Sequence, residues 1–332
     1  MALLNMALQP IDLQHKQQIV AGTEGRDRGH LFEKTLAEMI TDVNPSLINN
    51  GSFAISNKHL FTSNPALSLV SYICEFKKIF GIKKIKGYWL GGLATGKSGD
   101  FLVSKDVVVK KSKSDVLIDI VHSAGTLRVG VSVKTCNNKT PTNDQLFFTT
   151  ASAFCELLRT NNIVVTQSAE KALKMFCGDM GFRPLDMVKD IANRKSDPNR
   201  WFYEELPEKD KKEFEKVFGE NQNRITEVLL KKAYLGDPFP PDFLLHQTKS
   251  FTDIEQCEVA LYQIDELINL SAKYKGFWVK SYFVRKGSYK GDPNEHFAPR
   301  FGIVQFQRGG QKQHPTQLQF NLESGYFYKI SN

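Results

Sequence analysis

An aspartate and a lysine stand at the ends of two neighbouring apolar stretches of the sequence. Asp115 precedes the apolar run 116–121, and Lys134 closes the run 127–134. Side chains alternate along a strand, so Ser132 and Lys134 share one face while the valines between them point to the core. A lysine at the end of an apolar strand needs an anionic partner, and Asp115 is the candidate. Such a pair suits phosphodiester hydrolysis, in which oxygen ligands hold Mg²⁺ and a lysine acts on the attacking water.

The two stretches resemble the motif of the PD-(D/E)XK nuclease superfamily, and of type II restriction endonucleases in particular. Ser114-Asp115 stands in place of Pro-Asp, and Ser132-Val133-Lys134 in place of (Asp/Glu)-X-Lys. The expected order of helix, three strands, helix and strand over 26–166 also resembles that family's common core. The resemblance therefore covers about the first half of the chain. It implies hydrolysis of double-stranded DNA with Mg²⁺, leaving 5′-phosphate and 3′-hydroxyl ends.

Ser132 departs from the family pattern, because an acidic metal ligand usually occupies its position. Some restriction endonucleases with a Ser-X-Lys motif use a glutamate from another part of the chain as the missing metal ligand. Gly29-His-Leu-Phe-Glu33 resembles a Gly-x-x-x-Glu setting on the first helix, which favours Glu33. The helical wheel does not decide between Glu33 and Glu38, and both could be solvated helix residues. The candidates for the missing acid are Glu33, Glu38, Asp144 and Glu156.

The resemblance assigns roles to these residues. The expected catalytic set is Asp115, Lys134, Ser132 and Glu33. Asp115, Glu33 and the backbone carbonyl of Val133 would hold Mg²⁺. Lys134 would orient or deprotonate the attacking water, or stabilise the anion. Asp119 lies on the same strand face as Asp115, and we interpret it as a structural residue or as one that supports the metal ligands.

A segment rich in glutamine and arginine, 300–319, is a second indication of DNA binding. Arginine recognises guanine and glutamine recognises adenine through paired hydrogen bonds in the major groove. The alternative is a polar sheet face that ends in a Gly-Gly hairpin. Together with lysines before the catalytic strands, the expected DNA contacts are Lys97, Lys111, Lys113, Arg300, Gln305, Gln307, Arg308, Gln311, Lys312, Gln313, His314 and Gln317.

Positive charge is concentrated in two parts of the chain. The formal net charge is +8, from 44 basic and 36 acidic residues. Residues 75–115 contain ten basic and four acidic residues, and residues 273–314 contain nine basic and two acidic ones. The segment between them is rich in acid. This distribution favours one positive surface for DNA, although solvated lysines on loops would give the same counts.

Residues Gly91 to Ser98 match the P-loop pattern G-x-x-x-x-G-K-[ST]. A P-loop needs a helix that begins at the Lys-Ser pair, so that its amide groups surround phosphate. The following residues, 99–109, are instead typical of a loop and a strand. We therefore expect no nucleotide site there, and a contact of Lys97 with a DNA phosphate is the milder alternative.

The elements that position these residues follow from hydrophobic periodicity. Helices are predicted over 26–42, 65–80 and 143–159. Strands are predicted over 85–90, 107–110, 116–121, 127–134, 163–166, 277–285, 302–307, 317–322 and 326–330. The expected fold is α/β, with a restriction-endonuclease-like core of a mixed sheet flanked by helices. The expected segments are a nuclease core at 1–167, a helical region at 168–272 and a β-rich DNA-recognition region, packed on the core, at 273–332.

The composition of the chain indicates which general class of protein it belongs to. A length of 332 residues, 41% hydrophobic and 24% charged, is typical of a globular chain rather than a disordered one. The sequence predicts neither a membrane span nor a secretory signal, and five dispersed cysteines favour a cytoplasmic location. We expect a homodimer, since palindromic sites mirror two-fold symmetry, and the family implies a cognate methyltransferase. The alternatives are a repair or junction-processing nuclease, a non-catalytic DNA-binding protein and a P-loop NTPase.

Overall fold

The structure is a computed structural model, and it describes residues 12–51, 59–91, 103–104, 107–109, 111–274, 276–284, 291–309 and 315–330. The fold is mixed α/β. The chain forms two compact units, and neither is continuous in sequence. The six-stranded unit comprises Glu24–Asp144, Leu230–Ile268 and Ser324–Asn332, and the five-stranded unit comprises Met1–Thr23, Gln145–Leu229 and Asn269–Glu323. Among the described residues, no helix combines the length and apolarity needed to cross a membrane.

A mixed sheet with the strand order β1-β9-β8-β6-β5-β2 forms the six-stranded unit. Strand β8 runs parallel to β6, whereas every other neighbouring pair is antiparallel. The hairpin of β5 and β6 pairs Val116 with Val131 and Asp119 with Arg128. The strands are β1 (Leu60–Ser63), β2 (Lys84–Trp89), β5 (Val116–His122), β6 (Gly125–Thr135), β8 (Phe243–Gln247) and β9 (Cys257–Gln263).

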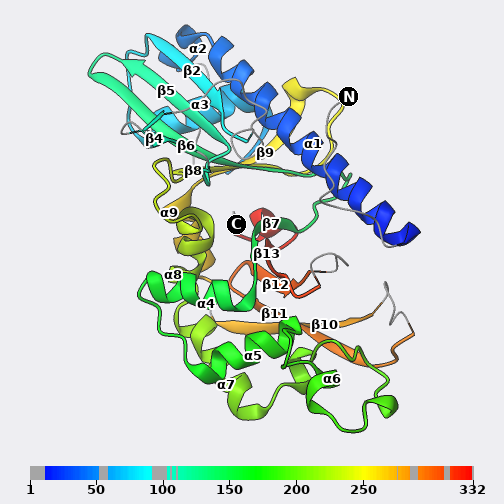
Figure 1. Ribbon diagram of the computed structural model, residues 1–332. Coiled ribbons are helices and arrows are strands. Elements are labelled where there is room, and N and C mark those ends of the chain that lie inside the picture. The colour runs from blue at the N-terminus through cyan, green and yellow to red at the C-terminus, as the bar shows by residue number, and fades with distance from the viewer. Residues whose placement is uncertain are drawn as a thin grey trace. The chain divides into compact units, whose positions relative to one another are not determined.

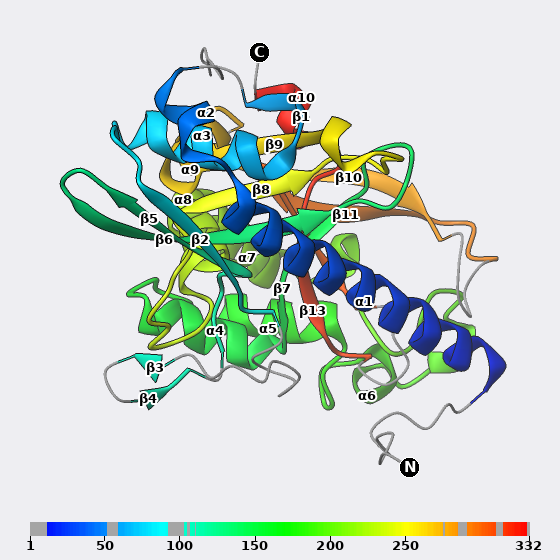
Figure 2. The same cartoon turned by 90° about the horizontal axis from the view of Figure 1, so that it is seen from above.

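Helices α1 (Leu13–Asp42) and α3 (Pro65–Phe76) cover one face of this sheet. Leu36 and Ile40 of α1 are fully buried with the alternate valines and isoleucines of β5 and β6. Figures 1 and 2 show this part of α1 lying over the sheet near β2. Gly87 of β2 permits the close crossing, because a Cβ there would lie 2.3 Å from the carbonyl oxygen of Ala37. Helix α1 therefore crosses β2 at Gly87, which pairs with Ile118 of β5.

The second sheet has the strand order β10-β11-β12-β13-β7 in the five-stranded unit. Phenylalanines on one face of β12 and β13, Phe306 and Phe320, pack against Phe154 of α4 and Phe218 of α7. Helices α4, α5 and α7 lie on this side of the sheet (Figure 1). The elements are β7 (Asp144–Thr149), β10 (Phe277–Phe283), β11 (Glu295–Phe301), β12 (Val304–Arg308), β13 (Leu318–Leu322), α4 (Ala151–Thr160), α5 (Gln167–Cys177) and α7 (Glu208–Glu220).

The remaining elements are short. Strands β3 (Val103–Ser104) and β4 (Val107–Val108) pair only with each other among the described residues. The other helices are α2 (Pro45–Asn49), α6 (Pro184–Met187), α8 (Gln222–Glu227), α9 (Ile264–Ser271) and α10 (Tyr326–Ile330). Single turns of 3-10 or π helix occupy Ile191–Asn193, Tyr203–Glu205, Val228–Lys232 and Ile254–Gln256.

The helical interpretation of 168–272 is wrong for two stretches that form central strands of the six-stranded sheet. Every residue of β8 is buried, and β9 is buried at all but one position. A short apolar run that is buried on both faces has no alternation, so periodicity alone cannot separate a strand from a buried helix. The six-stranded unit therefore takes residues 230–268 from the expected helical region.

Three further predictions differ from the structure. The helix expected over 143–159 begins only at Ala151, where the Thr150 side chain caps it by accepting a hydrogen bond from the amide of Ala153, and 144–149 form β7. Residues 163–166 form no strand. The aromatic run 326–330 is a helix because Tyr326, Phe327 and Ile330 bury one side at helical spacing.

Candidate active site

Asp115 and Lys134 meet at the end of the β5–β6 hairpin. Asp115 Oδ2 accepts hydrogen bonds from the Val133 amide at 2.6 Å and from Ser132 Oγ at 3.3 Å. Lys134 Nζ lies 3.8 Å from the same oxygen and donates to the Val133 carbonyl oxygen at 3.0 Å. Both side chains are largely buried, so the pair lies in a setting where charge interactions are strong. The expected pairing of Asp115 with Lys134 is confirmed.

Glu33 projects from α1 toward this pair. Trp89 Nε1 donates to Glu33 Oε2 at 3.1 Å, and the glutamate is buried. Burial is the main cause that raises the pKa of Glu33 to about 8, and the negative charge of Asp115 adds to the rise. The Trp89 hydrogen bond and the positive charge of Lys134 act in the opposite direction. The three charged groups are therefore close enough to sense one another.

Gly91 leaves the space that the Glu33 carboxylate occupies. A Cβ at this glycine would lie 2.2 Å from Glu33 Oε2 and 2.8 Å from Trp89 Nε1. Nothing larger than hydrogen fits there without moving the carboxylate. Glycine at position 91 thus accommodates the Glu33 carboxylate through a close approach, rather than through its backbone angles.

The other candidates for the missing acid lie in different surroundings. Glu38 is exposed on α1, 3.9 Å from Lys34, and Glu156 is exposed on α4 of the five-stranded unit. Asp144 is buried with its Oδ2 atom 2.6 Å from Nε2 of His246. Glu33 interacts electrostatically with both Asp115 and Lys134. Glu33 therefore remains the favoured candidate for the missing acid.

Lys113, which we expected to contact DNA, is buried next to the candidate site. Its amide donates to Asp237 Oδ2 at 2.5 Å, and burial, together with the charge of Lys134, lowers the pKa of its ammonium to about 7. The carboxylates of Asp115 and Asp237 oppose that change. Lys113 and Asp237 belong to the electrostatic surroundings of the site, and no sequence motif marked Asp237.

The expected DNA contacts other than Lys113 fall into three groups in the structure. Lys97 and the run 311–314, which contains Gln311, Lys312, Gln313 and His314, lie outside the described residues, and so does the P-loop match except for Gly91. Lys111 is exposed. The contacts expected on the second sheet, Arg300, Gln305, Gln307, Arg308 and Gln317, are buried or half-buried, and four of them lie on β11 and β12.

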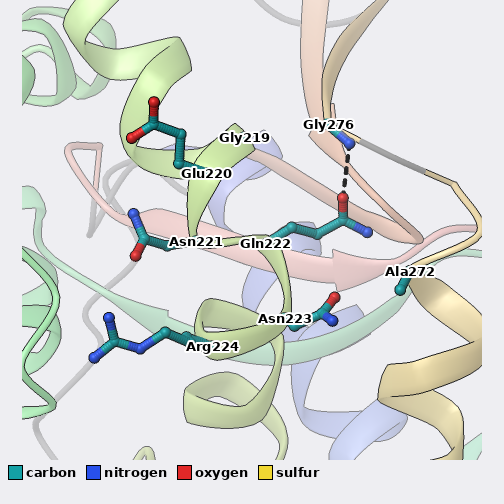
Figure 3. Close-up of a pocket in the computed structure, with 8 residues that line it drawn as sticks. All are labelled: Gly219, Glu220, Asn221, Gln222, Asn223, Arg224, Ala272 and Gly276. Atoms are coloured by element: carbon teal, nitrogen blue, oxygen red, sulfur yellow. Dashed lines mark hydrogen bonds between the residues drawn. The ribbon is translucent and has the colours of Figure 1, made fainter.

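A separate pocket of about 430 Å³ lies in the five-stranded unit, where α7 meets α8 (Figure 3). The Gln222 side-chain amide forms hydrogen bonds with the end of α9 and the loop that follows it. It donates to the carbonyl oxygens of Ser271 and Tyr274 and accepts from the Gly276 amide. Arg224 donates to two carbonyl oxygens at the end of α4. Both side chains therefore connect α8 to neighbouring loops of the unit through hydrogen bonds.

Asp119 pairs with an arginine on the neighbouring strand. It forms paired hydrogen bonds of 2.7 Å with Arg128, its direct neighbour on β6. Cys136 is buried just beyond Lys134. Gln247 of β8 donates to the Cys136 carbonyl oxygen at 2.7 Å and accepts from its amide at 3.0 Å, which fixes the end of β6.

Glu33 and Asp115 are the two carboxylates that the described residues bring next to Lys134. Among the described residues, no group of three or more His, Cys, Asp or Glu side chains could hold a metal ion. Mg²⁺ is commonly bound through one or two carboxylates and keeps several waters, so Glu33 and Asp115 are a suitable donor set. Asp115 Oδ1 receives no hydrogen bond from the described residues around it, whereas Oδ2 is engaged.

No family model matches the sequence, and the comparison with curated proteins gives no match either.

Proposed function

We propose that this chain is a Mg²⁺-dependent endonuclease that cuts double-stranded DNA, and specifically a type II restriction endonuclease. The observation that carries the proposal is the convergence of Glu33, Asp115 and Lys134 at the end of one hairpin. These are the residue types that phosphodiester hydrolysis requires, and they come from the positions that the family resemblance assigns.

The surrounding fold supports the same proposal. Helix α1 precedes the three antiparallel strands β2, β5 and β6, which is the beginning of the element order that the resemblance implies. The strand that completes the pattern is β8, which runs parallel to β6. We therefore take the six-stranded unit as a restriction-endonuclease-like core.

Two carboxylates would hold the cation. Asp115 and Glu33 supply hard oxygen ligands, and the Val133 carbonyl oxygen is the third candidate. Bound Mg²⁺ would offset negative charge on the phosphoryl group as the attacking oxygen approaches. In the structure, Lys134 Nζ already donates to that carbonyl oxygen at 3.0 Å, so lysine and cation would share it or compete for it.

The protein's own groups then act on water and phosphate. Lys134, held by Asp115, would orient the attacking water or stabilise the anion that forms. The attacking oxygen forms a bond to phosphorus while the bond to the 3′ oxygen breaks. The water proton passes to solvent or to a neighbouring base, and the 3′ oxygen leaves as an alkoxide that takes a proton from solvent to become a hydroxyl. Trp89 orients Glu33, and Ser132 helps to fix Asp115.

The test is cleavage of plasmid DNA with Mg²⁺ by the wild type and by Asp115→Ala, Lys134→Ala and Glu33→Gln. We expect discrete fragments from the wild type and a loss of cutting of about 100-fold or more in each variant. DNA binding, measured with Ca²⁺ in place of Mg²⁺, should survive. Glu38→Gln is the matched control, since Glu38 is exposed on the same helix, and should cut within about twofold of the wild type.

Two results would contradict the proposal. Normal cutting by Asp115→Ala and Lys134→Ala would place the active site elsewhere. A wild-type protein that binds DNA tightly and never cuts it would be a binding protein rather than a nuclease. Unspecific nicking or cutting of branched DNA would leave the nuclease core in place and assign it to repair.

A further inference from the structure

A proline-rich segment, 236–241, lies beside the loop that leads into Asp115. Three of its six residues are proline, which restricts the backbone, so the segment is stiff although it forms neither helix nor strand. It leads into β8, and because β8 pairs with β6, the sheet places the segment next to the β5–β6 hairpin. Lys113 and Asp237, which meet here, are 124 residues apart in sequence.

The proline-rich segment packs directly on β6 at Gly130. A Cβ at this glycine would lie 2.2 Å from Ser114 Oγ and 2.9 Å from the Pro240 carbonyl oxygen. Just beyond the segment, the Asp242 amide donates to the Gly130 carbonyl oxygen at 2.8 Å. Ser114 and the segment therefore share the space beside the hairpin, and a shift of one would displace the other.

Asp237 accepts hydrogen bonds with both of its carboxylate oxygens. Oδ2 accepts from the amide of Lys113, two residues before Asp115, at 2.5 Å. Oδ1 accepts from the Phe239 amide at 2.9 Å, which fixes the carboxylate within the proline-rich segment. Hydrogen bonds to a carboxylate are about twice as strong as those between neutral groups, so this one side chain joins the two stretches firmly.

Two serines of the loop, Ser112 and Ser114, donate to a single carbonyl oxygen, that of Phe239. Ser112 Oγ lies 3.1 Å from this oxygen, and Ser114 Oγ lies 2.6 Å from it. The whole loop 112–114 is therefore bonded to the proline-rich segment, and Asp115 follows directly. The Asp115 amide donates to a carbonyl oxygen of β6 at 2.9 Å, so β6 holds Asp115 while the segment holds the chain before it.

The charged groups of the site interact with the same stretch of chain. Asp115 and Asp237 are the two carboxylates that oppose the lowering of the Lys113 pKa. Burial is the main cause that raises the pKa of Tyr234, and the negative charges of Asp115 and Asp237 add to the rise. Two different side chains thus respond to both carboxylates, which places Asp237 in the neighbourhood of the candidate metal ligand.

We propose that Asp237 is a positioning residue of the candidate active site, which holds the loop 112–114 so that Asp115 presents its carboxylate to the cation. This inference rests on the proposed function, since it takes Asp115 as a ligand of Mg²⁺. Asp115 Oδ2 is bonded to the Val133 amide at 2.6 Å, so a shift of the backbone before Asp115 would change the direction of Oδ1. Loss of a group that orients a metal ligand typically lowers metal affinity or activity by about 10-fold to 100-fold.

The experiment measures binding of Mn²⁺, in place of Mg²⁺, to the full chain without DNA, from the electron paramagnetic resonance signal of the free ion. Asp115→Ala identifies the site and should abolish binding there. Asp237→Ala should weaken binding by about 10-fold to 100-fold. Asp253→Ala is the matched control, because Asp253 also accepts a backbone amide hydrogen bond, from Glu255 at 3.0 Å, in a different turn of the same unit. It should bind Mn²⁺ within about twofold of the wild type.

Asp237→Asn distinguishes positioning from a general role in folding, and it carries the test if Asp237→Ala does not fold. Asparagine keeps one acceptor oxygen and loses the other, so its Mn²⁺ affinity should lie between those of the wild type and Asp237→Ala. Single-turnover cutting of plasmid DNA is the second measurement. Both variants should need more Mg²⁺ for half-maximal cutting, and excess Mg²⁺ should restore part of the rate. A purely structural role would lower the melting temperature and leave the Mg²⁺ midpoint unchanged.

The outcomes separate this inference from the nuclease proposal. If every folded Asp237 variant binds Mn²⁺ as the wild type does, positioning by Asp237 is wrong, whatever the protein cuts. If the wild type binds no Mn²⁺, or if Asp115→Ala binds it unchanged, the inference also fails, because Asp115 then holds no cation. If the Asp237 variants bind Mn²⁺ more weakly and no form of the protein cuts DNA, the inference stands and the nuclease proposal fails.

Discussion

At the scale of single residues, the candidate site depends on how the Glu33 carboxylate is held. Glu33 is confined by the Trp89 indole and by the absence of a side chain at Gly91. Neither neighbour belongs to the motif that identified Asp115 and Lys134. Groups that hold a catalytic side chain in place can matter as much as the side chain itself, because displacements near 1 Å cost about 100-fold in rate.

We therefore predict that Gly91→Ala lowers the cutting rate by about 100-fold, because the new methyl group would displace Glu33 Oε2. The measurement is the single-turnover rate of plasmid cleavage, with thermal unfolding as a check on folding. Gly25→Ala on α1 is the matched control, since a Cβ there meets nothing within 4 Å. Full activity in Gly91→Ala would show that the position of Glu33 does not limit cutting.

At the scale of elements, two side-chain interactions hold the β5–β6 hairpin together. Asp115 and the Val133 amide join it at the site, and Asp119 and Arg128 join it in the middle. Hydrogen bonds from Arg128 are the main cause that lowers the pKa of Asp119, and Tyr88 adds to the effect. A carboxylate with a lowered pKa stabilises the fold above its unfolded-state pKa, near 3.9, and that stability is lost as the pH falls through the folded-state value.

Asp119→Asn should therefore lower the melting temperature at pH 7 and have less effect at about pH 3. The expected loss at pH 7 is about 1 kcal/mol or less, because the Arg128 side chain is 45% exposed and solvent screens the pair. Thermal unfolding of both proteins across this pH range gives the comparison. An equal difference at both pH values would mean that the aspartate acts through packing rather than through its charge.

At the scale of the whole molecule, the relevant property is the net charge of +8 and its concentration in residues 75–115 and 273–314. Within the first segment Lys113 is buried, so it does not contribute to an exposed surface, whereas Lys111 is exposed. The count of basic residues in a sequence therefore overstates the number that can reach phosphate. Salt dependence measures that number directly, since each phosphate contact adds about 0.9 to the slope.

DNA affinity should fall linearly on logarithmic axes as the salt concentration rises, with a slope on the order of −5 if six phosphates are contacted. Lys111→Gln should reduce that slope by about one unit without changing the preferred sequence. Fluorescence anisotropy with a labelled duplex at several salt concentrations provides the test. A slope near zero would mean that both basic segments are ordinary protein surface.

The sequence by itself determined the hairpin and the pair at its end. Asp115, Ser132 and Lys134 were predicted because alternation along a strand is a local property, and neighbouring strands in a hairpin are joined by a short turn. Helix α3 and the part of α1 from residue 26 onward were predictable for the same reason, since apolar spacing is a property of consecutive residues, whereas the first half of α1, from Leu13, was not predicted. The association of these residues with a nuclease came from the family resemblance, and it remains a prediction.

Only the tertiary structure decided which acid joins the pair. Glu33 and Glu38 are equivalent on a helical wheel, and they differ because α1 crosses β2 at Gly87 and directs Glu33 toward Trp89. The partner strand of β6 could not be predicted from the sequence either. Strand β8 is distant in sequence, and its residues are all buried, so they show no periodicity that distinguishes a strand from a helix. Contacts between distant segments set both outcomes, and no local pattern encodes them.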